Sequence, residues 1–262
     1  MPSERKCDII VFAPHPGDEA LGCAGLIYAQ IKKGRNVKLV LITNGDSDWE
    51  SWQKLHHREP RNEDMIELGY KRQKKTMDAM DLLGLNGNDI LFLGYPENFL
   101  SDILLSDEYS DINPFKSSFT GLNFTAYENS YSKNVPYCRA SFIGDIDKIL
   151  SQYNPKRVYI THPKDGDGDH RSSGMIIRDI VKDMKKPFAV YGYYVSYVRK
   201  SIELKAKQKR FLKATRKLRE ITLDKETKDV KKKCIRRYKT KEHLLVPLSV
   251  YFNDTESFWR LM

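Results

Sequence analysis

The stretch that decides the fold is PHPGDEALGCAG, residues 14–25, which follows the apolar run IIVF at residues 9–12. An apolar run that leads through a tight turn into a series of small residues is typical of a strand, a loop and a helix. His15 and Asp18 lie in the loop, and they offer an imidazole nitrogen and a carboxylate oxygen. Open α/β sheets bind their ligands at the carboxyl ends of the strands. The stretch therefore predicts a ligand site at the end of a first buried strand.

A second segment, DGDGDH at residues 165–170, follows another apolar strand, VYIT at residues 158–161. Together the two segments place His15, Asp18 and His170 at two strand ends. Two imidazoles and one carboxylate predict a three-ligand zinc site that leaves room for water. The alternatives are a satisfied loop histidine, a helix-capping aspartate and a flexible Gly-Asp turn. A calcium loop of the EF-hand type does not fit, because its spacing and terminal Glu are missing.

Composition favours one domain over residues 1–262, with 40% hydrophobic and 31% charged residues. The chain has no apolar run of the ~20 residues that a membrane span needs. The first residues lack the apolar core of a signal peptide, so we expect a cytoplasmic protein. The cysteines are scattered, which indicates free thiols in a reducing compartment; they are Cys7, Cys23, Cys138 and Cys234.

Strand-like and helix-like segments alternate along the chain. This order predicts an α/β fold of the Rossmann-like type, with a mainly parallel sheet and helices on both faces. No Gly-x-Gly-x-x-Gly or Walker loop follows the first strand, which argues against a nucleotide-dependent enzyme. We expect strands at 8–12, 37–43, 89–93, 157–161 and 189–195, helices at 18–33, 63–83, 142–152 and 170–185, and loops at 44–61 and 98–136.

Residues 14–25 and 163–170 resemble the two motifs of the PIG-L/LmbE-type zinc-dependent N-deacetylases. This resemblance implies an LmbE-like fold and a Zn²⁺ ion, or another divalent metal, held by His15, Asp18 and His170. It also implies a metal-dependent hydrolase that deacetylates an N-acetylated amino sugar or a related small amide. In that family the nucleophile is zinc-bound water. The expected partner is a small N-acetylated sugar or glycoconjugate, either neutral or anionic.

Two positions depart from the family pattern. Gly17 stands where the family has the aspartate that acts as general base, and Asp167 stands where it has a histidine. We predict that Asp167 takes over the role of base, and that Asp169 orients a ligand histidine. The alternative is a catalytically impaired zinc- or carbohydrate-binding relative of the deacetylases, because general acid–base help is worth roughly 10²–10⁴-fold.

Other polar and aromatic residues are candidates for substrate contacts. Arg72 and Glu97 could hydrogen-bond substrate hydroxyls, although exposed helix charges are the simpler interpretation. Arg72, His57 or His162 could assist an oxyanion. Residues 98–137 carry eight Phe and Tyr rings that could stack on sugar faces or simply pack a long loop onto the sheet.

The positive charge belongs to one segment. Residues 199–242 contain 19 Lys and Arg against 6 Asp and Glu, which makes this segment +13 and the rest of the chain −3. We expect a basic helical segment here, with an incomplete apolar stripe that includes Leu218 and Ile221. A solvated helix face is the simplest interpretation, and a phosphate-bearing substrate is the main alternative. The segment has no specific nucleic-acid signature beyond charge.

Overall fold

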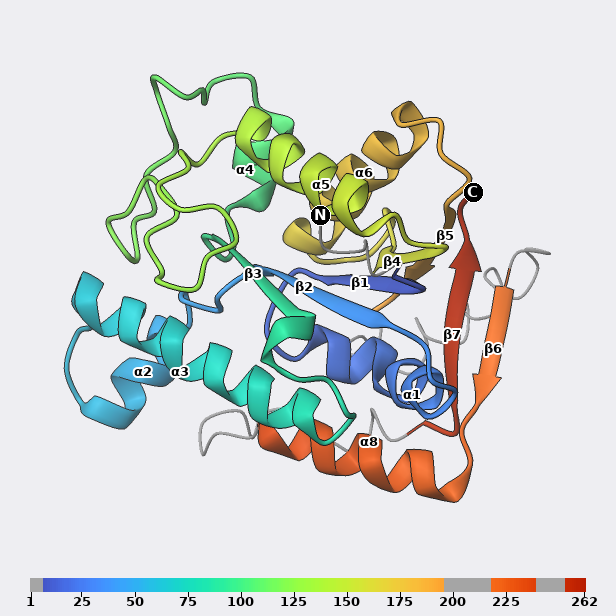
Figure 1. Cartoon of the computed structure of the whole chain (residues 1–262). Helices are drawn as coiled ribbons and strands as arrows, with labels where there is room; N and C mark the ends of the chain where they lie inside the picture. Colours follow the sequence, from blue (N-terminus) through green and yellow to red (C-terminus); the bar gives the residue numbers. More distant parts are fainter. Residues whose placement is uncertain (1–6, 196–217, 239–252) are drawn as a thin grey trace.

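The computed structural model describes residues 7–195, 218–238 and 253–262 and centres on a seven-stranded sheet (Figure 1). The strand order is β3-β2-β1-β4-β5-β7-β6. The first five of these strands pair in parallel, and the last two pair antiparallel at one edge. The strands are β1 (Ile9–Ala13), β2 (Val37–Thr43), β3 (Ile90–Tyr95), β4 (Arg157–Thr161), β5 (Ala189–Tyr193), β6 (Leu218–Thr222) and β7 (Thr255–Arg260).

The helices cover both faces of the sheet. In Figure 1, α1, α3 and α8 lie below the sheet, and α4, α5 and α6 lie above it. Residues 9, 11 and 13 of β1 pack into one core, and residues 10 and 12 pack into the other, as alternation along a strand requires. The helices are α1 (Asp18–Lys32), α2 (Trp49–His56), α3 (Asn62–Asp81), α4 (Leu100–Leu105), α5 (Arg139–Tyr153), α6 (Gly168–Asp183) and α8 (Lys225–Arg237), with a short 3-10 helix η1 (Gly87–Asp89).

The strand order reverses between β1 and β4. Ile9 of β1 pairs with Val37 of β2 on one side and with Arg157 of β4 on the other. The chain leaves β1 toward α1 on one face and leaves β4 toward α6 on the other (Figure 1). Such a reversal opens a crevice at the carboxyl ends of the two strands. Both sequence motifs begin there.

The small residues of α1 let other elements approach it closely. A Cβ atom at Gly22 would lie 2.4 Å from the ring of Tyr193, and a Cβ atom at Gly25 would lie 2.5 Å from Leu223. Larger side chains would force the sheet edge away from the helix. The run of small residues after His15 is therefore explained by packing.

The predicted Rossmann-like architecture is confirmed. Two strands, 37–43 and 157–161, have the predicted bounds, and the other predicted strands and helices are shifted at one or both ends by one to three residues. Residues 44–61 were expected to form a loop, but α2 occupies part of them. This helix is short and polar, and it is anchored by the buried Trp52. Residues 98–136 likewise contain the short helix α4.

The basic segment 199–242 is helical only in part. The expectation is wrong for residues 218–222, which form β6, because Leu218 and Ile221 pair with β7 at the edge of the sheet. Residues 225–237 are helical, as expected. Residues 199–217 and 239–242 lie outside the described residues. Within the part of the chain that the structure describes, no helix is long and apolar enough to cross a membrane.

Candidate metal centre

Three polar side chains meet at the crevice between β1 and β4. His15 lies two residues after the end of β1, and Asp18 is the first residue of α1. His170 lies in the first turn of α6, which follows β4. All three are nearly buried, since the side chains are 14%, 7% and 4% exposed. Sequence positions about 150 residues apart are thus brought to one point.

The facing atoms of these residues have the spacing of a metal-ligand set. His15 Nδ1 lies 3.3 Å from Asp18 Oδ2, and His170 Nε2 lies 3.0 Å from the same oxygen. The two ring nitrogens are 3.1 Å apart. Tetrahedral zinc ligands at bond lengths of roughly 2.0–2.1 Å would be about 3.3 Å from one another. The three atoms, here called the candidate metal centre, could hold such an ion.

A carboxylate lies behind each imidazole. His15 Nε2 is 3.0 Å from Asp169 Oδ2, and His170 Nδ1 is 3.3 Å from Asp165 Oδ1. Asp169 is itself fixed, because it accepts hydrogen bonds from the backbone N–H groups of Asn98 and Leu100 at 2.7 and 3.0 Å. Carboxylates placed in this way orient imidazole ligands and make them more basic. The orienting role predicted for Asp169 has this contact in its favour.

Asp167 also faces the candidate metal centre. Ligand atoms of His15, Asp167 and His170 lie within 4.8 Å of one another. Asp167 Oδ1 accepts hydrogen bonds from the backbone N–H groups of Asp169 and His170, so this residue is the N-cap of α6. The carboxylate is therefore held in place by the helix, within 4.8 Å of nitrogen atoms of the two imidazoles.

The charges at the centre perturb one another. Burial lowers the pKa of His170, but the Asp18 charge and the contact with Asp165 outweigh burial and raise it to about 9. His15 behaves similarly: burial lowers its pKa, while Asp18 and Asp169 raise it well above its usual range. Burial raises the pKa of Asp18, but the two imidazolium groups hold it well below normal. A divalent cation bound here would displace these protons.

Gly17 adopts a backbone conformation that fits its residue type. Its φ is 111°, a value that L-residues rarely adopt. Its N–H donates to Glu19 Oε2 at 3.0 Å, and Glu19 Oε1 accepts from the Tyr238 hydroxyl. A Cβ atom at position 17 would lie 3.7 Å from the ring of Tyr238, which is an ordinary van der Waals contact. Burial raises the pKa of Glu19 to about 7.

Arg72 and Glu97, the two predicted substrate contacts, lie together next to this loop. Arg72 pairs with Asp48 at 2.5 Å and lies 3.7 Å from Glu97 Oε1. Glu97 also accepts hydrogen bonds from the N–H and hydroxyl of Ser47. Asn98, the next residue, donates to Asp169. The pair therefore borders the candidate metal centre, and its charges are largely buried.

His57 and His162 lie elsewhere. His162 stacks on Tyr194 at a ring distance of 4.4 Å and meets Trp259 edge-on at 6.1 Å. His57 is exposed just after α2. Among the described residues, neither histidine contacts the candidate metal centre, so the geometry does not support their predicted help to an oxyanion.

The aromatic region divides into two parts. Tyr127 and Tyr137 are 1% exposed and pack the loop onto the sheet. Phe99, Phe115 and Phe119 form a half-buried cluster, with the ring of Phe99 4.9 and 5.6 Å from the other two. Phe99 follows Asn98 directly, so this cluster is the part of the region that borders the site.

Sequence reasoning missed Asp165, Glu19, Asp48 and Tyr238 as parts of the site. Asp165 and Glu19 stand inside the two motifs, so their position alone could have drawn attention to them. Asp48 and Tyr238 offer no such signal, because only the packing of α2 and α8 brings them close.

Comparison with known proteins gives a family. Residues 10–181 match the profile of the family described as PIG-L: GlcNAc-PI de-N-acetylase. This range covers about two thirds of the chain and includes both motifs. Among curated protein sequences, no match was found.

Solved structures share the fold at low sequence identity. N,N'-diacetylchitobiose deacetylase from Pyrococcus horikoshii is 17% identical with a TM-score of 0.57, over 98% of this chain and 84% of its own. The zinc-inhibited form of teicoplanin deacetylase Orf2 is 14% identical with a TM-score of 0.54, over 96% and 97%. GalB, a 4-carboxy-2-hydroxymuconate hydratase from Pseudomonas putida, is 12% identical with a TM-score of 0.60, over 97% and 94%. The fold thus carries deacetylases and at least one other reaction.

Proposed function

Because this chain belongs to the family described as PIG-L: GlcNAc-PI de-N-acetylase, we propose that it is a metal-dependent hydrolase that removes the acetyl group from an N-acetylated amino sugar or a related small amide. Family membership and the shared fold support deacetylase chemistry in general. The metal, the ligand residues and the substrate are our proposals. We assign the activity to a single PIG-L/LmbE-like domain over residues 1–262.

The observation that carries the proposal is the spacing of His15 Nδ1, Asp18 Oδ2 and His170 Nε2. Their separations of 3.0–3.3 Å suit a divalent ion, with zinc as the first choice. Asp169 and Asp165 hold the far nitrogens of the two imidazoles, so the near nitrogens are directed at the ion. A bound ion would supply a Lewis acid for the amide oxygen and lower the pKa of an attacking water.

Asp167 is our candidate for general base. Its Oδ1 is engaged as the N-cap of α6, so Oδ2 is the oxygen that would take a proton from the attacking water. The same oxygen would then return this proton to the nitrogen of the departing amine. The hydrogen bonds to Oδ1 hold the carboxylate at one orientation throughout.

Arg72 and Glu97 are our candidates for substrate recognition. Arg72 is held by Asp48 and Glu97, so its guanidinium keeps its position before substrate arrives. Glu97 could accept hydrogen bonds from sugar hydroxyls, and Phe99 offers an apolar face nearby. The four buried free cysteines fit a cytoplasmic setting.

The test is hydrolysis of N-acetylglucosamine and N,N'-diacetylchitobiose, with metal content measured on the same sample. We expect Asp167→Asn to lower kcat by roughly 10²–10⁴-fold, because the amide keeps the N-cap oxygen and removes the base. Bound metal should stay constant. Asp147→Asn, an exposed carboxylate on α5, is the matched control and should leave kcat unchanged.

Two outcomes would contradict parts of this proposal. Full activity of Asp167→Asn with metal retained would exclude Asp167 as base. Metal binding without turnover of either sugar would favour the alternative, a catalytically impaired zinc- or carbohydrate-binding relative, for which the absence of a carboxylate at Gly17 is the supporting observation.

A further inference from the structure

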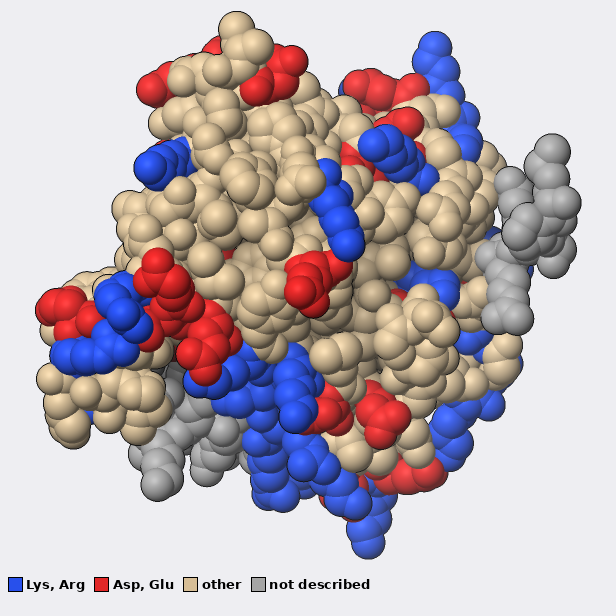
Figure 2. All heavy atoms as spheres, turned by 60° about the vertical axis from the view of Figure 1, so that its left-hand side comes forward, with Lys and Arg blue, Asp and Glu red and all other residues tan. Residues whose placement is uncertain are grey.

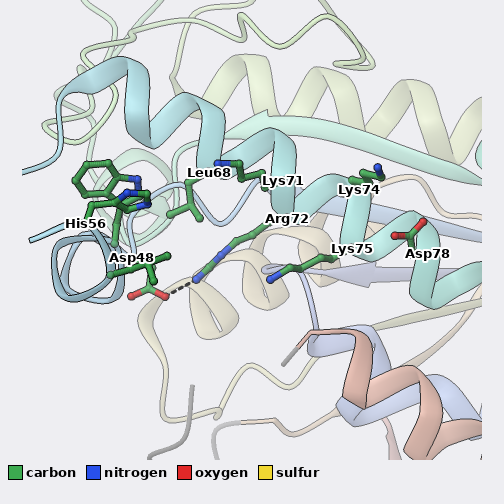
Figure 3. A pocket seen from close by; sticks show the side chains of 10 residues that line it. Asp48, His56, Leu68, Lys71, Arg72, Lys74, Lys75 and Asp78 are labelled. Carbon is green, nitrogen blue, oxygen red and sulfur yellow. Dashed lines mark hydrogen bonds and ion pairs between the residues drawn. The ribbon is translucent and has the colours of Figure 1, made fainter. Parts of the chain in front are cut away.

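A pocket of about 330 Å³ lies between α2 and α3 (Figure 3). Its wall from α2 is aromatic and apolar, and its wall from α3 is basic. The lining residues are Asp48, Trp52, Leu55, His56, Leu68, Lys71, Arg72, Lys74, Lys75 and Asp78. We call this space the α3 pocket.

The charge of the α3 pocket is positive. Four Lys and Arg side chains line it against two Asp side chains, so the lining residues have a formal charge of +2 with the histidine neutral. Two of these cations also have a carboxylate partner outside the lining, since Lys71 pairs with Glu67 at 2.7 Å and Arg72 lies 3.7 Å from Glu97. In Figure 3, Arg72 and Lys75 extend from the same side of α3, and Arg72 reaches Asp48. Residues three apart on a helix lie on one face, so Arg72 and Lys75 can both contact one ligand.

The opposite wall is held together by ring contacts and an ion pair. Trp52 is 8% exposed, and the guanidinium of Arg58 lies 4.4 Å from its ring centre. The ring of His56 stacks on Trp52 at 4.2 Å. Arg58 is in turn paired with Asp64 of α3 at 2.9 Å, which joins the two helices. The pocket is therefore largely formed before a ligand arrives.

The α3 pocket adjoins the candidate metal centre through Arg72. This side chain lines the pocket and also lies 3.7 Å from Glu97. Arg72 and Pro16 both pack against Gly45, and Pro16 directly follows His15. One substrate could therefore reach both places, with its acetamide at the metal centre and another group in the pocket.

The surface outside the pocket is also basic. In Figure 2, Lys and Arg side chains gather on the lower part of the face that α3 and α8 form. Lys71 and Lys74 of α3 and Lys233 and Arg236 of α8 are exposed. Such a field attracts anions and raises the rate at which they arrive.

We propose that the α3 pocket binds a dianionic phosphate monoester carried by the substrate. This inference rests on the proposed function and specifies its substrate class. A monoester carries a charge of about −1.5 to −2 at neutral pH, which matches the pocket better than a singly charged diester. Lys75 and Arg72 would donate to the phosphate oxygens, and the Trp52 wall would contact the sugar that bears it.

The first test compares N-acetylglucosamine 6-phosphate and 1-phosphate with N-acetylglucosamine and with a singly charged diester, the methyl ester of N-acetylglucosamine 6-phosphate. We expect one of the monoesters to have the lowest KM. Lys75→Gln should raise that KM about tenfold or more, as expected for one lost charge-assisted hydrogen bond, and change kcat little. Lys33→Gln, an exposed lysine after α1, is the matched control and should leave this KM unchanged.

A second test does not depend on turnover. Glucose 6-phosphate carries the phosphate without an acetamide, and its binding can be followed by calorimetry. We expect binding that weakens with salt and with Lys75→Gln, in a variant whose circular dichroism matches the parent. If binding depends on Lys75 but no sugar is hydrolysed, the proposed function fails and the pocket assignment stands.

The opposite result would overturn the pocket assignment alone. One such result is equal KM values for phosphorylated and unphosphorylated sugars, with no effect of Lys75→Gln on either. The proposed deacetylase activity would then stand, and the proposed phosphate site would be wrong. If the diester has the lowest KM, the preference for a monoester is wrong and the substrate belongs to a different class.

Discussion

Gly17 differs from the family pattern in two ways. It lacks the carboxylate of the family's aspartate, and its backbone angle favours glycine. Gly17 has a φ of 111° and is held by Glu19, which in turn binds Tyr238. Any L-residue here is strained, even though a Cβ atom would meet only ordinary contacts. The position therefore decides both stability and the choice of base.

We expect Gly17→Asp to lower the free energy of unfolding by about 1–3 kcal/mol, as measured by urea titration, because of backbone strain. Gly17→Ala has the same strain without the carboxylate and should lose a similar amount. Turnover separates the candidate bases. A tenfold or larger gain in kcat for Gly17→Asp would show that a carboxylate at position 17 serves as general base. This result would argue against Asp167 in that role.

His162, which is not one of the candidate ligands, gives a further pH dependence. Burial, with a smaller effect of Lys164, lowers its pKa to about 4. Between pH 4 and 6.5 the unfolded chain therefore binds more protons at this residue than the folded protein does. Its contribution to stability is complete above pH 6.5 and is lost as the pH falls toward 4.

We expect His162→Asn to flatten the rise of unfolding free energy between pH 4.5 and 6.5. The Asn oxygen can still accept from the backbone N–H of Lys164, which donates to His162 Nδ1 at 3.0 Å. His57→Asn, at an exposed position, should keep the parent slope. An unchanged slope in His162→Asn would mean that this histidine titrates alike in both states.

At the scale of single residues, the sequence predicted the candidate ligands but not their surroundings. His15, Asp18 and His170 could be found because each follows a strand and stands inside a recognisable motif. Asp48 and Tyr238 could not, because their contacts depend on how α2 and α8 pack. The role of Asp167 as N-cap of α6 was likewise not predicted from the sequence, although its nearness to the imidazoles was expected.

At the scale of elements, α1 is bound in its middle by an ion pair from α8 and β7. Glu256 accepts hydrogen bonds from the backbone N–H groups of Gly25 and Leu26, both at 2.8 Å. Lys231 pairs with Glu256 at 2.5 Å and donates to the carbonyl of Leu21 at 3.0 Å. The Lys231 and Glu256 side chains are 4% and 2% exposed. This buried pair ties three elements together.

We expect Glu256→Ala to destabilise the protein by about 3–5 kcal/mol, because it leaves Lys231 buried without its counter-charge. The double variant Lys231→Met/Glu256→Leu should be less destabilised than the single one. Thermal unfolding monitored by circular dichroism would measure both. Equal losses in the two variants would mean that the bonds to α1, and not the unpaired charge, dominate.

Elements with a strong apolar period were predictable, and elements set by their neighbours were not. The strand at 37–43 is a continuous apolar run, and its bounds were predicted correctly. By contrast, β6 has a charged and partly exposed sequence that composition favours as helix. Its strand state depends on pairing with β7, which starts 37 residues after Leu218 and cannot be seen locally.

At the scale of the whole molecule, the candidate metal centre joins the two halves of the sheet. His15 and Asp18 come from the end of β1 and the start of α1, and His170 comes from α6, which follows β4. A bound ion would stabilise the fold by about 2.7 kcal/mol when free metal is 100 times its Kd. Stability should therefore depend on metal.

We expect a chelator to lower the Tm and added zinc to restore it. Asp18→Asn should abolish the zinc response, while Asp147→Asn should keep it. Differential scanning calorimetry on metal-depleted protein measures the shift. A Tm that changes neither with chelator nor with added zinc would argue against a metal at these residues.

The bond between Gly25 and Glu256 also has a consequence for biosynthesis. These residues are separated by 231 positions along the chain. At translation rates of roughly 5–20 residues per second, the second appears on the order of 10–50 s after the first. During that interval α1, which begins with Asp18, lacks the carboxylate that binds its middle turn. The contacts that fix α1 are therefore complete only when synthesis has passed Glu256.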